Sequence, residues 1–382
     1  MLKIRLIAIF LLVACTSFTI TKEGFPFFDV ISEEGMPVAL APINIDDPLM
    51  NYADTTYTLL TKDGKRLFYQ HIFTPVCMDN ACFPVNITFY WDILGNYHSY
   101  RVSKNKPLTK IGHAPFTKED YEKLDRVLAD PYSILGNYSK EDLKQLVEDD
   151  KNPKKEKTDA TSGATWQMGE SLVIDGALYT CHTLWKLCNG PIRERIVSYT
   201  KEHLLDENLM KASLTSEDDA FKRFAIGQLP DFPMDAMHAE VLQLALGQDA
   251  DMSYWLLYQL PSTYYAFDPF TLSLIDRFND LPRYDVRVAC LKKLRENKEL
   301  SDGSMKALIA KGYDIDPSLL TNLLYVLCKQ TSITKENTKL ALKLVKEKKA
   351  VLEEDRFFTR AFLYDTFEMN SLYEKINGLF GH

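Results

Sequence analysis

The first half of the chain alternates apolar and polar residues in short segments, a pattern that predicts β-strands. Within residues 55–73, two such segments flank Lys62-Asp63-Gly64-Lys65, and Asp-Gly is a preferred turn of a two-residue hairpin. A second hairpin is predicted from Val85 to Val102, with its turn at Gly95-Asn96. Together the two hairpins predict an antiparallel sheet at the centre of the N-terminal half.

Two helices are predicted after this sheet. The segment from Thr117 to Asp120 has the residues of a capping box, and an apolar stripe follows it until Pro131. From Leu172 to Cys188 apolar residues recur every three or four positions, and Asn189-Gly190-Pro191 is a typical helix end. Residues 16–200 are therefore predicted to form an α+β domain with an antiparallel sheet.

The second half of the chain has helical periodicity and no strand pattern. From about residue 201 to the end, amphipathic helices are predicted to alternate with short loops. Examples are Ala236–Leu246, Met252–Gln259, Thr271–Phe278, Val286–Glu296, Ser304–Ala310, Leu319–Cys328, Asn337–Glu347 and Phe357–Asn370. Their paired rhythm resembles degenerate HEAT-type repeats in an α-solenoid, and a compact helical bundle is the alternative. Residues 201–382 are therefore predicted to form an all-α domain that docks an unidentified protein partner.

The N-terminus has the pattern of a bacterial export signal. Lys3 and Arg5 precede an apolar segment, Leu6 to Val13, which is too short to span a membrane. The segment ends in Leu12-Val13-Ala14-Cys15, which resembles a lipobox. This resemblance implies that residues 1–15 contain a lipoprotein signal peptide and that Cys15 carries the lipid. The alternative is an ordinary cleaved signal with an incidental cysteine.

These features predict an exported protein in the periplasm or on the cell surface, anchored to the membrane through Cys15. Thr16 and Ser17 follow the cysteine, so the aspartate of an inner-membrane retention signal is missing and the outer membrane is favoured. The formal net charge of −8 and the pI of about 5.5 argue against a nucleic-acid partner.

The sequence Asp159-Ala160-Thr161-Ser162-Gly163-Ala164-Thr165 carries the main site prediction. It resembles the flavinylation signature of the FMN-binding domain family, found in the covalent-flavin subunits of sodium-pumping quinone reductases and related complexes. The resemblance implies that a flavin transferase attaches FMN to Thr165 through a phosphoester. It also implies that the strand, Gly-turn, strand pattern before the motif belongs to this domain.

The residue types of the motif suit this chemistry. Gly163 and Ala164 leave the threonine hydroxyl uncrowded, and Ser162 completes the small-residue turn. Asp159 is predicted to orient the segment or to help hold a cation near the phosphate. A helix starting soon after Thr165 would direct backbone N–H groups at that phosphate.

The resemblance also implies that a threonine-bearing loop after the second hairpin, with Thr109 and Lys110, lies against the flavin. The match to the family is incomplete. The family usually has a further Thr-Ser pair directly after the motif, where this chain has Trp166-Gln167-Met168, and the family's upstream tetrad is missing near Thr109. The alternative for the motif is a polar turn that caps a helix.

The cysteines give a second possible redox element. Cys77 and Cys82 flank a sequence suited to a tight turn, which predicts a local disulfide pinning a loop. A redox-active pair that exchanges electrons with a flavin is the alternative. Buried thiols are predicted at Cys181, Cys188, Cys290 and Cys328.

The sequence therefore supports two functions of different classes. The first is a membrane-anchored flavoprotein that carries FMN on Thr165 and passes electrons to or from an unidentified partner. It would act as an electron carrier or reductase subunit rather than as a stand-alone enzyme. The second is a flavin-free scaffold or binding lipoprotein that keeps the fold and docks a partner on its helical half.

Overall fold

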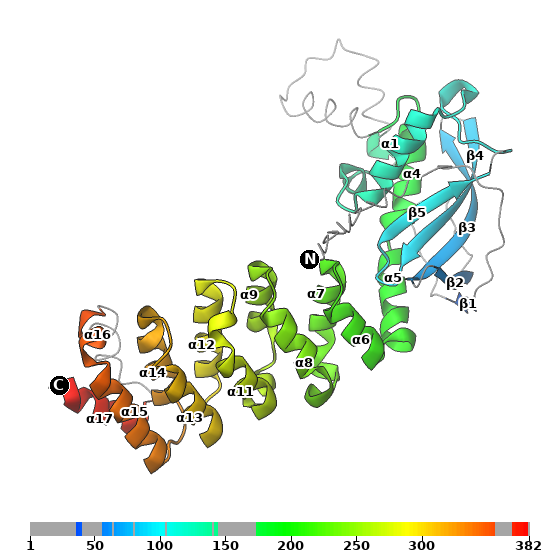
Figure 1. Ribbon diagram of the computed structural model, residues 1–382. Helices are drawn as coiled ribbons and strands as arrows, with labels where there is room; N and C mark the ends of the chain where they lie inside the picture. Colours follow the sequence, from blue (N-terminus) through cyan, green and yellow to red (C-terminus); the bar gives the residue numbers. More distant parts are fainter. Residues whose placement is uncertain are drawn as a thin grey trace, which may run out of the picture. The chain divides into compact units, whose positions relative to one another are not determined.

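The computed structural model describes residues 36–39, 56–62, 65–78, 81–103, 105–139, 141–143, 173–355 and 369–380. The chain forms two compact units, Met1–His203 and Leu204–His382. The N-terminal unit contains an antiparallel sheet with helices, and the C-terminal unit is helical (Figure 1). The predicted succession of an α+β part and an all-α part is therefore confirmed.

The sheet is an antiparallel meander whose five strands pair in chain order. Its strands are β1 (Met36–Ala39), β2 (Thr56–Lys62), β3 (Lys65–Met78), β4 (Ala81–Asp92) and β5 (Tyr97–Val102). Both predicted hairpins are present, as the pair Lys62 and Lys65 closes the first and Trp91 pairs with Tyr97 in the second.

A third hairpin, between β3 and β4, was not predicted from the sequence. Its register runs from Leu67 opposite Asp92 to Met78 opposite Ala81, so the two strands are longer than their alternating segments. Pro75 and Pro84 lie opposite each other in this ladder. Because proline cannot donate a ladder hydrogen bond, it weakens the strand signal in a sequence.

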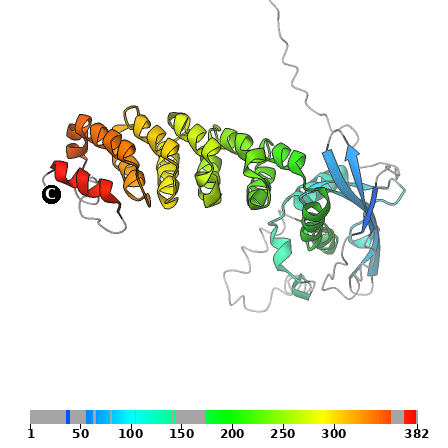
Figure 2. The same ribbon diagram turned by 90° about the horizontal axis from the view of Figure 1, so that it is seen from below.

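One face of the sheet packs on helices. The buried side chains of β3 and β4 alternate along each strand and include Phe68, Ile72, Ile87 and Phe89. Helix α4 (Leu178–Asn189) packs against β3, and α1 (Lys118–Ala129) packs against β5 and α4 (Figure 2). Helix α5 (Ile192–Tyr199) then continues from α4.

Side chains of α4 join it to its neighbours by hydrogen bonds to backbone carbonyls. Asn189 Nδ2 donates to Leu128 O at 2.9 Å, and Trp185 Nε1 donates to Asp130 O at 2.8 Å. In the other direction, the buried Trp91 Nε1 of β4 donates to Cys188 O at 2.8 Å. These bonds satisfy carbonyls near two helix ends and fix α4 against both the sheet and α1.

The start of α1 is as predicted and the start of α4 is not. Thr117 accepts from the Asp120 amide while the Asp120 carboxylate accepts from the Thr117 amide, which completes the capping box. Helix α4 begins at Leu178, so the prediction of a helix from Leu172 is wrong for Val173–Ala177. Gly176 there has φ +70, a left-handed conformation that interrupts a helix.

The C-terminal unit consists of helices in two layers. One layer contains α6 (Glu207–Leu214), α8 (Met234–Ala245), α11 (Asp268–Asp276), α13 (Asp302–Lys311), α15 (Lys335–Glu347) and α17 (Ser371–Phe380). The other contains α7 (Asp219–Gln228), α9 (Ala250–Gln259), α12 (Tyr284–Glu296) and α14 (Leu320–Cys328). Within each layer successive helices contact each other, and they follow one another in a row (Figures 1 and 2).

The described part of this unit also contains two shorter α-helices, α10 (Ser262–Ala266) and α16 (Lys349–Glu354). Of the helices given as examples from the sequence, seven match α8, α9 and α11 to α15 to within a few residues. The predicted helix Phe357–Asn370 lies almost wholly outside the described residues, so only its end, Met369-Asn370, is seen, and these two residues are not helical.

Equivalent hydrogen bonds join successive helices of the first layer. The Asp268 carboxylate accepts from Ser301 and Ser304, which lie 33 and 36 residues further on. At the other helix ends, Lys311 donates to Asp276 O and Lys348 donates to Tyr313 O, each across 35 residues. This spacing is that of helical-hairpin repeats of about 34 residues and is shorter than the roughly 40–47 residues of HEAT repeats.

Candidate functional site

The predicted attachment segment lies outside the described residues. This holds for Asp159, Ser162, Gly163, Ala164 and Thr165, and also for the predicted lipidation residue Cys15. The first described residue after the motif is Val173, which opens the turn before α4. Two of the predicted cofactor-contacting residues, Thr109 and Lys110, are described.

Thr109 and Lys110 belong to a closed loop between β5 and α1. Thr109 forms an isolated antiparallel bridge with Pro115, and the Lys110 amide donates to Ala114 O at 2.7 Å. Between them, Gly112 (φ 77) and His113 (φ 60) are both in the left-handed region, which reverses the chain within three residues. The loop is thus a defined structural element, closed by its own backbone hydrogen bonds.

This loop is held against the segment that follows the motif. The Ile111 amide donates to Gly176 O at 2.8 Å. A Cβ built on Gly176 would lie 3.6 Å from Lys110 Cβ, so the two backbones are close neighbours. The structure therefore brings the Thr109–Lys110 loop to the turn that links the predicted attachment segment to α4.

The charge of Lys110 is matched by a carboxylate on α1. Its ammonium lies 2.7 Å from Asp120 Oδ2, and both side chains are partly exposed, with 24% and 14% of their surface accessible. Burial raises the pKa of Asp120, but hydrogen bonds from Lys110 and from Thr117 outweigh this and hold the pKa below its usual value. Asp120 stays ionised at neutral pH and fixes the Lys110 ammonium near the loop.

Two tyrosines, Tyr100 and Tyr121, form buried hydrogen bonds next to this loop. The Leu108 amide donates to Tyr121 OH at 3.0 Å, and Tyr100 OH donates to Tyr121 O at 2.9 Å. Burial is the main cause that raises the pKa of Tyr100 far above its usual range. These phenols therefore remain protonated and act as hydrogen-bonding groups rather than as bases.

The thiols under the sheet are packing groups. Cys181 and Cys188 are fully buried and free, as are Cys290 and Cys328 in the helical unit, which confirms the prediction of buried thiols. Burial raises the pKa of Cys181 to about 11 and raises the pKa of Cys188 well above its usual value. Because the thiolate is the reactive form, these positions are unsuited to redox chemistry at neutral pH.

Cys77 and Cys82 lie on either side of the tight connection between β3 and β4, at the position where the sequence predicts a tight turn. Their backbones lie directly opposite each other in the β3–β4 ladder, one pair away from the end of the hairpin. Only two residues separate Met78 from Ala81, and in such a hairpin the next pair inward is the closely spaced, non-hydrogen-bonded type. The side chains of both cysteines lie outside the described residues.

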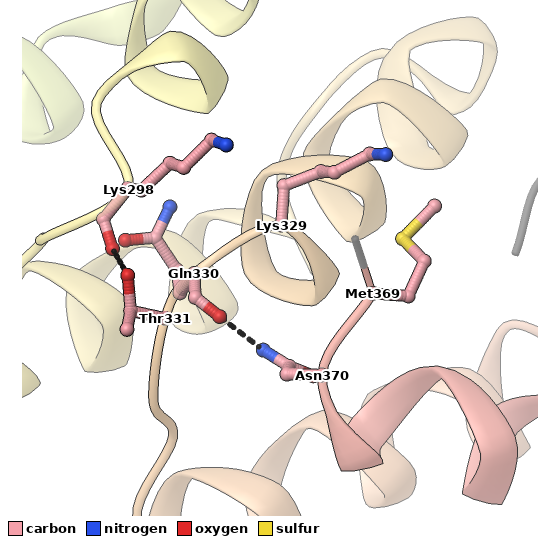
Figure 3. A pocket seen from close by; sticks show the side chains of 6 residues that line it. All are labelled: Lys298, Lys329, Gln330, Thr331, Met369 and Asn370. Atoms are coloured by element: carbon pink, nitrogen blue, oxygen red, sulfur yellow. Dashed lines mark hydrogen bonds between the residues drawn. The ribbon is translucent and has the colours of Figure 1, made fainter. Parts of the chain in front are cut away.

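The helical unit contains a polar cavity of about 210 Å³ (Figure 3). It is lined by Lys298, Lys329, Gln330, Thr331, Met369 and Asn370. Gln330 is 2% exposed, accepts from the Leu300 amide at 2.8 Å and donates to Asn297 O at 3.1 Å. These bonds tie the end of α14 to the connection between α12 and α13, so the cavity wall is part of the scaffold.

The remaining observations define no second site. Across the residues that the structure describes, no group of three or more His, Cys, Asp or Glu side chains is arranged to hold a metal ion. In the same part of the chain, no helix is long and apolar enough to cross a bilayer. The cavity beside Gln330 was missed by the sequence analysis, since a single glutamine between helices carries no pattern.

No protein-family model, curated protein or solved structure matches this chain significantly.

Proposed function

We propose that this protein is an exported, membrane-anchored flavoprotein that carries FMN as a phosphoester on Thr165 and transfers electrons to a protein partner. The observation that carries the proposal is the seven-residue motif from Asp159 to Thr165. The lipobox-like segment ending in Cys15 supports the location, because its pattern is that of a bacterial export signal.

The arrangement of the Thr109–Lys110 loop supports the placement of a ligand beside it. The hydrogen bond from Ile111 to Gly176 brings this loop to the segment that follows the motif. Lys110 supplies a cationic group there, and Asp120 determines where that group lies. An ammonium group forms strong, charge-assisted hydrogen bonds to phosphate oxygens, and this favours a phosphoester beside the loop. An antiparallel sheet with helices on one face is also compatible with the FMN-binding domain.

The chain's own residues have simple roles in this proposal. The Thr165 hydroxyl forms the ester by displacing the leaving group of an activated flavin nucleotide, and its proton departs with that group. Ser162, Gly163 and Ala164 keep the hydroxyl accessible to the transferase. When bound, FMN supplies reversible electron transfer, and the protein supplies position and electrostatics. The chain is then an electron carrier or a reductase subunit, and its helical unit docks the partner.

The attachment is tested by co-expressing the full chain with a flavin transferase. After denaturation and electrophoresis, we expect flavin fluorescence in the wild-type band and none in Thr165→Ala. Thr161→Ala is the matched control, because it removes a hydroxyl of the same motif and keeps Thr165. A colourless wild type contradicts the proposal, and equal fluorescence in both variants moves the ester to another residue.

A second candidate function is a flavin-free scaffold or binding lipoprotein with the same fold. The observation that favours it is Trp166-Gln167-Met168, where the FMN-binding family has a further Thr-Ser pair. If the protein is such a scaffold, it acquires no covalent flavin when it is co-expressed with a competent transferase. Replacing Trp166-Gln167 by Thr-Ser would then restore labelling at Thr165, which separates a lost recognition sequence from a fold that does not present the hydroxyl.

A further inference from the structure

Helix α15 exposes four lysines along one side. Lys335, Lys339, Lys343 and Lys346 are all exposed, whereas Asn337, Thr338, Ala341, Leu344 and Val345 of the same helix are buried. At 100° per residue the four lysines fall within about 80° of arc and extend over about 16 Å of helix. We call these four residues the lysine row.

The charge of the lysine row is almost uncompensated within the described part of the chain. The Lys343 ammonium lies 3.8 Å from the Glu347 carboxylate. Both side chains are exposed, and ion pairs between exposed side chains contribute little to stability. Lys335, Lys339 and Lys346 form no ion pair with another described residue. Glu336, the other acidic neighbour on α15, is engaged at 3.0 Å by Lys306 of α13.

Four like charges on adjacent turns of one helix repel one another. The chain as a whole is acidic, with a net charge of −8, so the lysine row stands out from the average of the sequence. A flat, repeating array of anions would remove this repulsion. The buried face of α15 is already used in the core, which leaves the lysine row free for contact.

We propose that the lysine row docks on the anionic phosphates of a phospholipid surface. A membrane is chosen over an acidic protein because the segment ending in Cys15 predicts that the chain is tethered at one. A tethered chain meets phosphate headgroups at high local concentration. Lysines near an anionic surface then strengthen binding roughly fivefold each. The proposal does not depend on flavin attachment.

The test uses the full chain with Cys15→Ser, so that no lipid is attached, and vesicles of phosphatidylcholine with or without phosphatidylglycerol. We expect co-sedimentation with phosphatidylglycerol vesicles, little with phosphatidylcholine alone, and loss of binding as salt rises. Changing all four lysines of the row to Gln should weaken partitioning at least about tenfold. The control changes Lys106, Lys118, Lys201 and Lys292, which are also exposed, to Gln and removes the same total charge.

Circular dichroism spectra of both fourfold variants should match the spectrum of the parent chain, which controls for loss of folding. Failure of the parent chain to bind phosphatidylglycerol vesicles overturns the proposal. Equal weakening in the control overturns the assignment to α15, because net charge alone would then explain binding. Binding to soluble polyglutamate but not to vesicles would assign the row to an acidic protein instead.

Discussion

The amide of Ile111 donates a 2.8 Å hydrogen bond to the carbonyl oxygen of Gly176. This bond joins the loop after the second hairpin to the turn before α4, two segments that the predicted attachment motif separates in sequence. Gly176 accepts the bond in a left-handed conformation, with φ +70. The position of the Thr109–Lys110 loop therefore depends on a backbone conformation that favours glycine.

Glycine-to-alanine changes should form a graded series in stability. Gly176→Ala should lower the free energy of unfolding by about 1 kcal/mol, because its added Cβ has room but its φ is strained. Gly95→Ala should cost at least about 2 kcal/mol, because Gly95 also has φ +71 and its Cβ would lie 2.7 Å from Arg193 Cα. Gly227→Ala, on helix α7 with open space, should be neutral or slightly stabilising.

Urea denaturation of the three variants measures this series. If Gly95→Ala is as stable as Gly227→Ala, this result would contradict the close contact between the β4–β5 turn and the Arg193 backbone of α5.

Asp120→Asn should weaken the N-terminal unit in a pH-dependent way. The variant loses the ion pair with Lys110, and its capping box is weaker. Together these losses should lower the free energy of unfolding by about 1 kcal/mol at neutral pH. Because the folded state lowers the pKa of Asp120, its carboxylate stabilises the fold above the unfolded pKa of about 3.9, and this contribution is lost as pH falls through the lower folded value. The difference between wild type and variant should therefore be largest near pH 7 and shrink below about pH 4.

Thermal unfolding at several pH values measures this difference. Glu122→Gln is the control, because Glu122 is exposed and its pair with Lys118, at 3.8 Å, contributes little. A constant difference between wild type and Asp120→Asn from pH 7 to pH 3 would contradict the role assigned to the Asp120 carboxylate.

Gln330→Ala should destabilise the helical unit by about 2 kcal/mol. The change removes the acceptor of the Leu300 amide and the donor to Asn297 O and Val326 O, all at a buried position. Gln259→Ala, at an exposed position on α9, should change stability by less than about 0.5 kcal/mol. Equal denaturation midpoints for the two variants would show that the Gln330 side-chain hydrogen bonds to Leu300, Asn297 and Val326 do not hold these repeats together.

The opposed backbones of Cys77 and Cys82 predict a disulfide in protein exported to an oxidising compartment. Intact mass under non-reducing conditions should be lower by two hydrogens than after reduction. Closing so short a loop should add about 2 kcal/mol of stability, which Cys77→Ser/Cys82→Ser removes. Reductant should lower the melting temperature of the wild type to that of the double variant and leave the variant unchanged. Two free thiols in exported protein would refute this pairing.

Sequence patterns predicted most of the fold but little of the geometry of the candidate site. The hairpin at Lys62 and Lys65 and the capping box at Thr117 follow from local backbone preferences, which a sequence displays directly. The longer β3–β4 pairing was missed because Pro75 and Pro84 obscure it, and the early helix start was wrong because the apolar period continues through Gly176. The contact between Ile111 and Gly176 joins distant backbone groups, and side-chain patterns do not encode such a bond.

The most direct test of the flavoprotein account is the mass of the protein isolated from its native host. Peptide mapping after denaturation should find one flavin mononucleotide ester per chain, on the peptide that contains Thr165. A chain mass free of any flavin nucleotide, or a nucleotide on a different peptide, would contradict the account.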